Sequence, residues 1–134
     1  MPRIRAGYTG KYKLSKHGFY VAYHYALLYN SWLGEYNALA DSTTGVMYGK
    51  SEIWTDNDKV ERYAARRGEL RAKMEKVEQS AAEADPELYE YIMLGVTNED
   101  VTFNILQSKY HIPLSRNRYY DRRRKFYFIL SSKI

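Results

Sequence analysis

A basic segment near the end of the chain holds the side chains best suited to a chemical task. Residues 115–125 read SRNRYYDRRRK, and Ser115 can cap a helix that begins at Arg116. Arginine and asparagine are the side chains that most often pair with guanine and adenine edges in the major groove of DNA. Further basic side chains along such a helix hold phosphates. The candidate DNA-binding residues are Ser115, Arg116, Asn117, Arg118, Arg122 and Lys125.

Two predicted helices position this segment. The first spans residues 98–109 and opens with a capping box formed by Thr97 and Asp100. Its inward residues are expected to be Val101, Ile105 and Leu106. Ile112 and Pro113 end the helical run, because proline cannot continue a helix.

The second helix is expected from about Arg116 to Ser132. Its predicted buried residues recur at helical spacing and are Tyr119, Phe126, Tyr127 and Leu130. Two capped helices joined by a tight turn are typical of a helix-turn-helix, whose second helix enters the major groove. We therefore predict a helix-turn-helix with a basic recognition helix over residues 97–134.

Helical periodicity also accounts for the rest of the chain, and no strong strand signal appears. We predict an all-α fold of about six helices, with a flexible basic arm at 1–14 and a helical core or interaction region at 15–96. The first helix is expected to begin at Lys16, with Ser15 as its cap. A shorter second helix is expected to bury Trp32, Leu33, Tyr36 and Leu39. A loop at 41–54, a long helix at 57–82 and a short helix between Asp85-Pro86 and Gly95 complete the expected elements.

Charge is distributed unevenly along the chain. Residues 1–16 hold five basic groups and no acid, residues 17–108 hold eight basic and fifteen acidic groups, and residues 109–134 hold eight basic groups and one acid. The formal net charge of +5 therefore hides two basic ends around an acidic middle. Concentrated positive charge at a terminus is typical of polyanion binding. The arm adds Arg3, Arg5, Lys11 and Lys13 as candidate phosphate contacts.

The residue types and spacings argue against several classes of protein. The 134 residues contain no cysteine, so neither a disulfide framework nor a thiolate metal site is available. No apolar run is long enough to span a bilayer, so we expect no membrane partner and a cytoplasmic location. His17 and His24 lie two helical turns apart, too far to share a metal. We expect no enzyme, no catalytic residue, no metal and no cofactor.

The end of the chain resembles a known group of proteins. From Ile112-Pro113 through Arg116 to the run YYDRRRKFY at 119–127, it looks like the C-terminus of small proteins encoded by phages and prophages of Gram-positive bacteria. Residues 97–132 are more distantly similar to RinA/ArpU-type regulators of phage late transcription, which end in a sigma-factor-like helix-turn-helix. The resemblance implies a sequence-specific regulator that binds duplex DNA and works beside RNA polymerase.

One position departs from that pattern. Sigma-like turns usually hold a glycine just before the apolar turn residue, whereas this chain has His111 there and adds Pro113. We therefore expect a longer turn between the two helices.

The sequence leaves open both the class of target and the oligomeric state. A phage-encoded inhibitor or decoy that binds a host nucleoprotein, such as a defence nuclease, would use the same arginines against protein acids or bound nucleic acid. A homodimer that reads two half-sites and a monomer held beside RNA polymerase are also both consistent with the sequence. Trp54, in the expected loop, is the candidate interface residue, because tryptophan is a common interface anchor.

Overall fold

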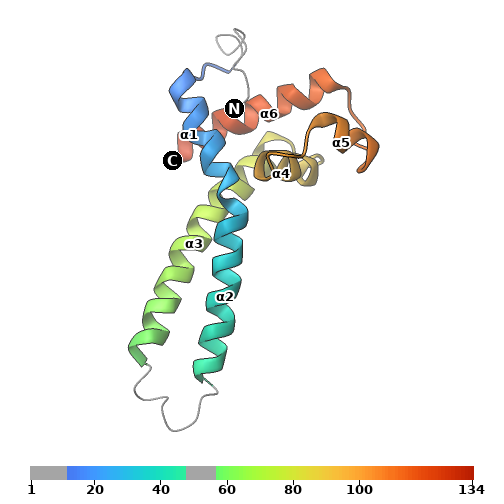
Figure 1. Cartoon of the computed structure of the whole chain (residues 1–134). Helices are drawn as coiled ribbons and strands as arrows, with labels where there is room; N and C mark the ends of the chain where they lie inside the picture. Colours follow the sequence, from blue (N-terminus) through green and yellow to red (C-terminus); the bar gives the residue numbers. More distant parts are fainter. Residues whose placement is uncertain (1–11, 48–56) are drawn as a thin grey trace. The chain divides into compact units, whose positions relative to one another are not determined.

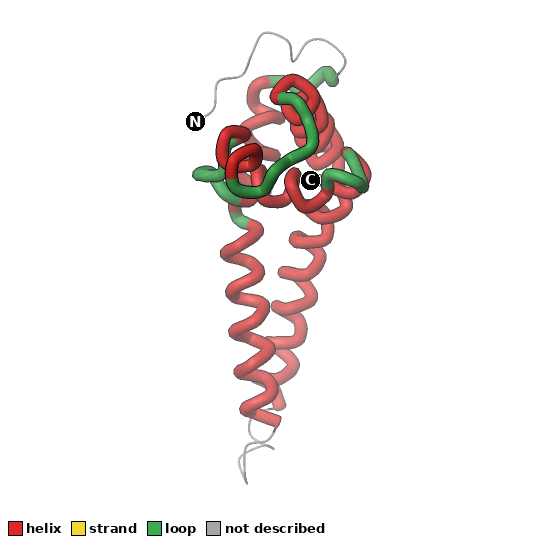
Figure 2. Tube along the Cα trace, turned by 90° about the vertical axis from the view of Figure 1, so that its right-hand side faces the viewer, coloured by secondary structure: helices red, strands yellow, loops and turns green. Residues whose placement is uncertain are grey.

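The computed structural model describes residues 12–47 and 57–134, and for residues 41–47 and 57 it describes the backbone alone. Within these ranges the chain forms helices and no strand (Figure 2), which confirms the predicted all-α fold. Only Leu28 separates the first two helices. The helices are α1 (Lys16–Leu27), α2 (Tyr29–Met47), α3 (Asn57–Ala84), α4 (Tyr89–Thr97), α5 (Phe103–Ser108) and α6 (Arg116–Lys133), as labelled in Figure 1.

These helices belong to two compact units. The first, here called the α6 unit, combines α1, residues 76–84 of α3, and α4 to α6. The second, here called the hairpin unit, combines α2 with residues 57–75 of α3. Residues 97–134 fall in the α6 unit, in which α6 packs along α1 and α4.

Aromatic side chains build the core of the α6 unit. The ring of Tyr127 lies 5.1 Å from that of Phe19 and 6.3 Å from that of Tyr23, so α1 and α6 meet through three rings. Burying each large apolar side chain of this kind contributes roughly 1.5–3 kcal/mol. The face predicted for α6 from helical spacing is confirmed, since Tyr119, Phe126, Tyr127 and Leu130 are buried. The buried residues of α1 are Phe19, Ala22, Tyr23 and Ala26.

A buried tyrosine ties the connection after α4 to this core. The hydroxyl of Tyr23 donates a hydrogen bond of 3.2 Å to Oε1 of Glu99. Burial, together with the nearby Glu99 carboxylate, raises the pKa of Tyr23 to about 12. The phenol therefore remains a donor throughout the neutral range, and it anchors a segment that lies between two helices.

Cations hold the two helices of the hairpin unit together. Arg66 on α3 bonds Glu35 on α2 and Glu69 on its own helix, both at 3.1 Å, and its hydrogen bond lowers the pKa of Glu35. The guanidinium of Arg67 lies 4.2 Å above the ring of Tyr36, within the range of a cation–π contact. The buried apolar side chains of this unit are Trp32, Leu70 and Met74. The hairpin thus has a thin core supported by polar contacts.

Two predictions for α2 are wrong. The helix continues to Met47, whereas a loop was expected from residue 41. The residues at 41–45 each disfavour a helix by tenths of a kcal/mol, with glycine near 1 kcal/mol, but extending an existing helix needs no new nucleus. Leu33 is 37% exposed rather than buried, because Trp32 takes the inward position beside it. The rest of the expected loop, 48–54, lies outside the described residues.

The prediction that Gly95 ends its helix is also wrong. The residue lies inside α4, buried, and the helix continues to Thr97. A methyl group on Gly95 would overlap the hydroxyl of Tyr119 and would come within 3.3 Å of the ring carbon that carries it. Gly95 is therefore required by the close approach of α6, and no unusual backbone conformation is involved.

The helix before the basic segment begins later than predicted. α5 starts at Phe103, and its N-cap is Thr102, whose hydroxyl accepts from the N–H of Ile105 at 3.4 Å. The hydroxyl of Thr97 instead donates to the carbonyl of Met93 at the end of α4. The shift changes which side chains face inward: Phe103 and Leu106 are buried, Val101 is half-buried and Ile105 is 36% exposed.

Candidate nucleic-acid interface

The basic helix α6 begins where the sequence predicts. Ser115 is its N-cap, and the Ser115 hydroxyl accepts a hydrogen bond of 3.4 Å from the N–H of Arg118. The connection from α5 runs over residues 109–115, longer than the three or four residues of an ordinary helix-turn-helix turn. The expected longer turn is thus observed, and the assignment of the pair as a helix-turn-helix stays a prediction.

His111 adopts an unusual backbone conformation in this connection. Its φ of 54° lies in the left-handed region, where glycine is the preferred residue. The N–H of Ile112 then donates to the carbonyl of Leu106 at 3.1 Å, which closes the end of α5. The backbone therefore turns at His111 as it would at a glycine, although the residue carries a side chain.

Replacing His111 with glycine is expected to raise the free energy of unfolding by about 0.5–1 kcal/mol, because a left-handed L-residue costs roughly 1–2 kcal/mol and part of that gain is lost to the freer unfolded chain. Thermal unfolding followed by circular dichroism measures the change. Lys109→Gly is the matched control, since φ is −97° there and glycine should destabilise the protein. Equal destabilisation by both substitutions would contradict the left-handed conformation.

A small apolar cluster fixes α5 against α6. Phe103 and Leu106 from α5 meet Ile112 from the connection and Tyr119 from α6, and all four side chains are buried. The rings of Phe103 and Tyr119 lie 5.7 Å apart. The first turn of α6 is thereby held on a packed base, which limits its motion relative to α5.

Arg116 is the most constrained of the candidate contact residues at the start of α6. Its Nη2 donates to Oδ1 of Asn104 at 2.6 Å, and its guanidinium lies 5.1 Å above the ring of Phe103. Arg116 remains exposed despite these contacts. The guanidinium is therefore oriented in advance, while part of its hydrogen-bonding edge stays open to solvent.

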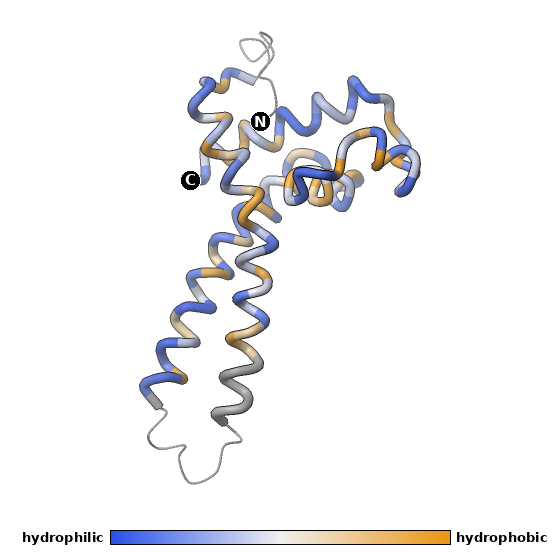
Figure 3. The backbone as a smooth tube through the Cα atoms, viewed as in Figure 1, coloured by the Kyte–Doolittle hydropathy of each residue, from blue (hydrophilic) through white to orange (hydrophobic). Residues whose placement is uncertain are grey.

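Asn117 and Arg118 complete this exposed turn. Both side chains are exposed, and they follow Arg116 directly on α6. Figure 3 shows that the first half of α6 is hydrophilic along its length. Three of the predicted contact residues therefore share one accessible end of a helix.

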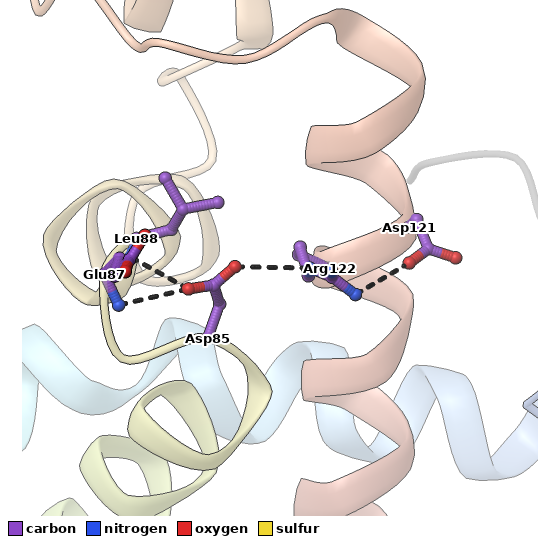
Figure 4. Close-up of polar contacts among 5 residues, drawn as sticks. All are labelled: Asp85, Glu87, Leu88, Asp121 and Arg122. Carbon is purple, nitrogen blue, oxygen red and sulfur yellow. Dashed lines mark hydrogen bonds and ion pairs between the residues drawn. The ribbon is translucent and has the colours of Figure 1, made fainter.

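Arg122 has a different environment from the one expected. Its Nε donates to Oδ2 of Asp85 and its Nη1 to Oδ2 of Asp121, both at 3.2 Å (Figure 4). The side chain is 31% exposed and that of Asp85 is 21% exposed. Asp85 also accepts from the N–H groups of Glu87 and Leu88, at 3.0 and 3.3 Å. The two ion pairs use two of the five N–H donors of the guanidinium, so a phosphate would compete with two nearby carboxylates for Arg122.

The other basic residues of α6 divide between packing and surface positions. Arg123 donates to the hydroxyl of Tyr127 at 3.3 Å, and its guanidinium lies 5.8 Å from the ring of Tyr120. Arg124 and Lys125 are half-buried. Arg123 thus belongs to the aromatic core, whereas Lys125 keeps part of its side chain in solvent.

Several predicted contacts cannot be placed. Arg3, Arg5 and Lys11 lie outside the described residues, and so does Trp54. Lys13 is described and exposed.

Asp85 and Asn104, which hold two of the candidate arginines, were not predicted from the sequence. The position of Asp85 before Pro86 predicts a helix cap, which is wrong because α4 begins at Tyr89 with Leu88 as its N-cap. The partner of Asp85, Arg122, lies 37 residues away. No local pattern reveals such a pair.

Among the described residues, no group of three or more histidine, aspartate or glutamate side chains could hold a metal ion. None of the described helices is long and apolar enough to cross a membrane. No family model, curated protein or solved structure matches the chain.

Proposed function

We propose that the protein is a sequence-specific DNA-binding regulator of phage late transcription, which places the start of α6 in the major groove of duplex DNA. The observation that carries this proposal is the exposed turn Arg116-Asn117-Arg118 on a helix end that α5 holds in place. These side-chain types match the donor and acceptor patterns of guanine and adenine edges. Lys125 and Lys13 supply phosphate contacts, and Arg122 is a weaker candidate because Asp85 and Asp121 already neutralise its charge.

The start of α6 offers one arginine that is already held in place and two side chains that are free to contact bases. Arg116 is already oriented by Asn104 and Phe103, so it loses little side-chain entropy on binding. Asn117 and Arg118 point into solvent from the same turn and are the candidates for base readout. RNA polymerase is the proposed protein partner, and its contact is tested by transcription from a promoter that carries the selected site.

The DNA-binding proposal predicts two separable effects. A preferred duplex is first selected from a random-sequence pool, and affinities are then measured by fluorescence anisotropy at several salt concentrations. Asn117→Ala and Arg118→Gln are expected to weaken binding to the preferred duplex by about 1–3 kcal/mol, or roughly 5- to 150-fold, with a much smaller effect on random DNA. Affinity of the parent protein should fall steeply with salt, because phosphate contacts release counterions.

A matched control separates these effects from net charge. Arg62→Gln removes the same charge from an exposed position on α3, outside the α6 unit, and should leave DNA affinity close to that of the parent. If the pool yields no preferred sequence and the α6 variants bind random DNA as the parent does, α6 is not a DNA reader. Capture of a host nucleoprotein by the parent, lost in Arg118→Gln, would then favour the inhibitor function.

A further inference from the structure

Asn104 on α5 holds the first arginine of α6 in one orientation. Its Oδ1 accepts a hydrogen bond of 2.6 Å from Nη2 of Arg116, which lies 12 residues further along the chain. Because a guanidinium only donates, the amide of Asn104 must present its oxygen to Arg116. The ring of Phe103 lies 5.1 Å from the guanidinium and supports one of its faces. Two neighbouring residues of α5 therefore restrain the same side chain of α6.

The support beneath Arg116 belongs to the core of the α6 unit. Phe103 is only 3% exposed, and it packs in the buried cluster that also contains Leu106, Ile112 and Tyr119. Asn104 follows Phe103 directly in α5. The groups that orient Arg116 are consequently attached to a packed helix and not to a loop.

Arg116 keeps its charge and most of its donors despite this restraint. Asn104 is neutral, whereas Arg122 is partnered by two carboxylates. The hydrogen bond to Asn104 uses one of the five N–H donors of the guanidinium. The side chain of Arg116 is exposed, so the other donors can meet acceptors outside the protein.

One base edge in the major groove matches a pair of donors. Guanine presents two acceptors, O6 and N7, side by side, whereas adenine places an acceptor beside a donor, thymine an acceptor beside a methyl group, and cytosine a donor. An arginine that turns freely also finds phosphate oxygens, which carry no sequence information. Restraint of the guanidinium therefore favours guanine over the DNA backbone.

We infer that Arg116 reads a guanine and that Asn104 is the positioning residue that makes this contact specific. The inference rests on the proposed DNA-binding function, to which it adds the identity of one base and a role for α5. Asn104 acts through Arg116 and needs no contact with DNA. Loss of the Asn104 side chain should release Arg116 to nearby phosphates, so the preference for guanine falls while the affinity for random DNA is kept.

Binding to the selected duplex and its variants tests this assignment. The position read by Arg116 is the guanine at which Arg116→Ala no longer distinguishes guanine from an analogue that carries C–H in place of N7. Changing this base pair to any other should weaken binding of the parent protein by roughly 5- to 150-fold. In Asn104→Ala the same change should cost several-fold less. Affinity for random-sequence DNA and its salt dependence should stay close to those of the parent, because the charge is unchanged.

Two comparisons separate positioning from a general disturbance of the helices. Gln107→Ala is the matched control, since Gln107 is exposed on the same helix α5, and it should leave every base preference unchanged. In Asn104→Ala, the preferences at positions that respond to Asn117→Ala and Arg118→Gln should also persist.

The possible failures of this experiment are distinguishable. An undiminished guanine preference in Asn104→Ala, or a preferred duplex in which no guanine responds to Arg116→Ala, would overturn the inference and leave DNA binding by α6 intact. The absence of any preferred duplex would overturn the proposed function and this inference together.

Discussion

Replacing Gly95 with alanine is expected to be the most damaging small substitution in the α6 unit. The added methyl group would overlap the Tyr119 hydroxyl, and Tyr119 is a rigid ring that is only 1% exposed. Leu106 lies 3.8 Å from the same point, which leaves the ring little room to move. Overpacking of this kind costs about 1–3 kcal/mol and outweighs the gain in helix propensity from glycine to alanine. Urea unfolding followed by circular dichroism measures the loss.

A second substitution should recover much of that loss. The Tyr119 hydroxyl is buried without a hydrogen-bond partner among the described residues, and burial raises the pKa of Tyr119 to about 12. Removing an unpaired buried hydroxyl costs little or stabilises the fold. Tyr119→Phe should therefore leave the parent close to unchanged and should make Gly95→Ala considerably less harmful.

Gly68 provides the control for helix propensity. It lies in α3, and an added methyl group would have nothing within 4 Å, so the close helix crossing that a mid-helix glycine can mark is not observed there. Gly68→Ala should stabilise the protein by about 0.5–1 kcal/mol. If Gly95→Ala also stabilises the protein, or if Tyr119→Phe gives no rescue, the proposed contact between α4 and α6 is wrong.

Removing the guanidinium of Arg122 is expected to lower the free energy of unfolding by about 1–2 kcal/mol. An exposed ion pair contributes only about 0–1 kcal/mol, but the side chain of Asp85 is only 21% exposed and would lose its cationic partner. Arg122→Met keeps most of the aliphatic length and removes the charge. Chemical unfolding at neutral pH measures the effect.

The two roles of Asp85 can be separated. Asp85→Asn keeps an oxygen that accepts from the N–H groups of Glu87 and Leu88 but removes the negative charge, whereas Asp85→Ala also removes that acceptor and should cost about 1 kcal/mol more. A double-mutant cycle of Asp85→Asn with Arg122→Met gives the coupling energy of the pair.

The exposed pair Arg71–Glu75 serves as the reference for this measurement. Its atoms are also 3.2 Å apart, but both side chains are more than 40% exposed. Arg71→Met should therefore change stability by no more than about 0.5 kcal/mol. Equal effects of Arg71→Met and Arg122→Met, with no coupling in the cycle, would show that Arg122 is not held by Asp85 in solution.

The sequence by itself determined the helical class and the strongest elements. The long helix predicted at 57–82 is α3, and the caps at Ser15 and Ser115 begin α1 and α6 as expected. These features are readable because a cap bonds within three residues and an apolar stripe repeats within one helix. The accessible position of Asn117 and Arg118 also follows from the phase of the buried residues on α6.

Only the tertiary structure decided how these elements are used. It assigned Gly95 to a close contact with Tyr119, moved the start of α5 to Phe103, and gave Arg122 a partner that lies far away in sequence. Each of these outcomes depends on an atom from another helix. The energies of local propensity are a few tenths of a kcal/mol, whereas a steric overlap or an unpaired buried carboxylate costs one or more, so the long-range contact prevails wherever the two disagree.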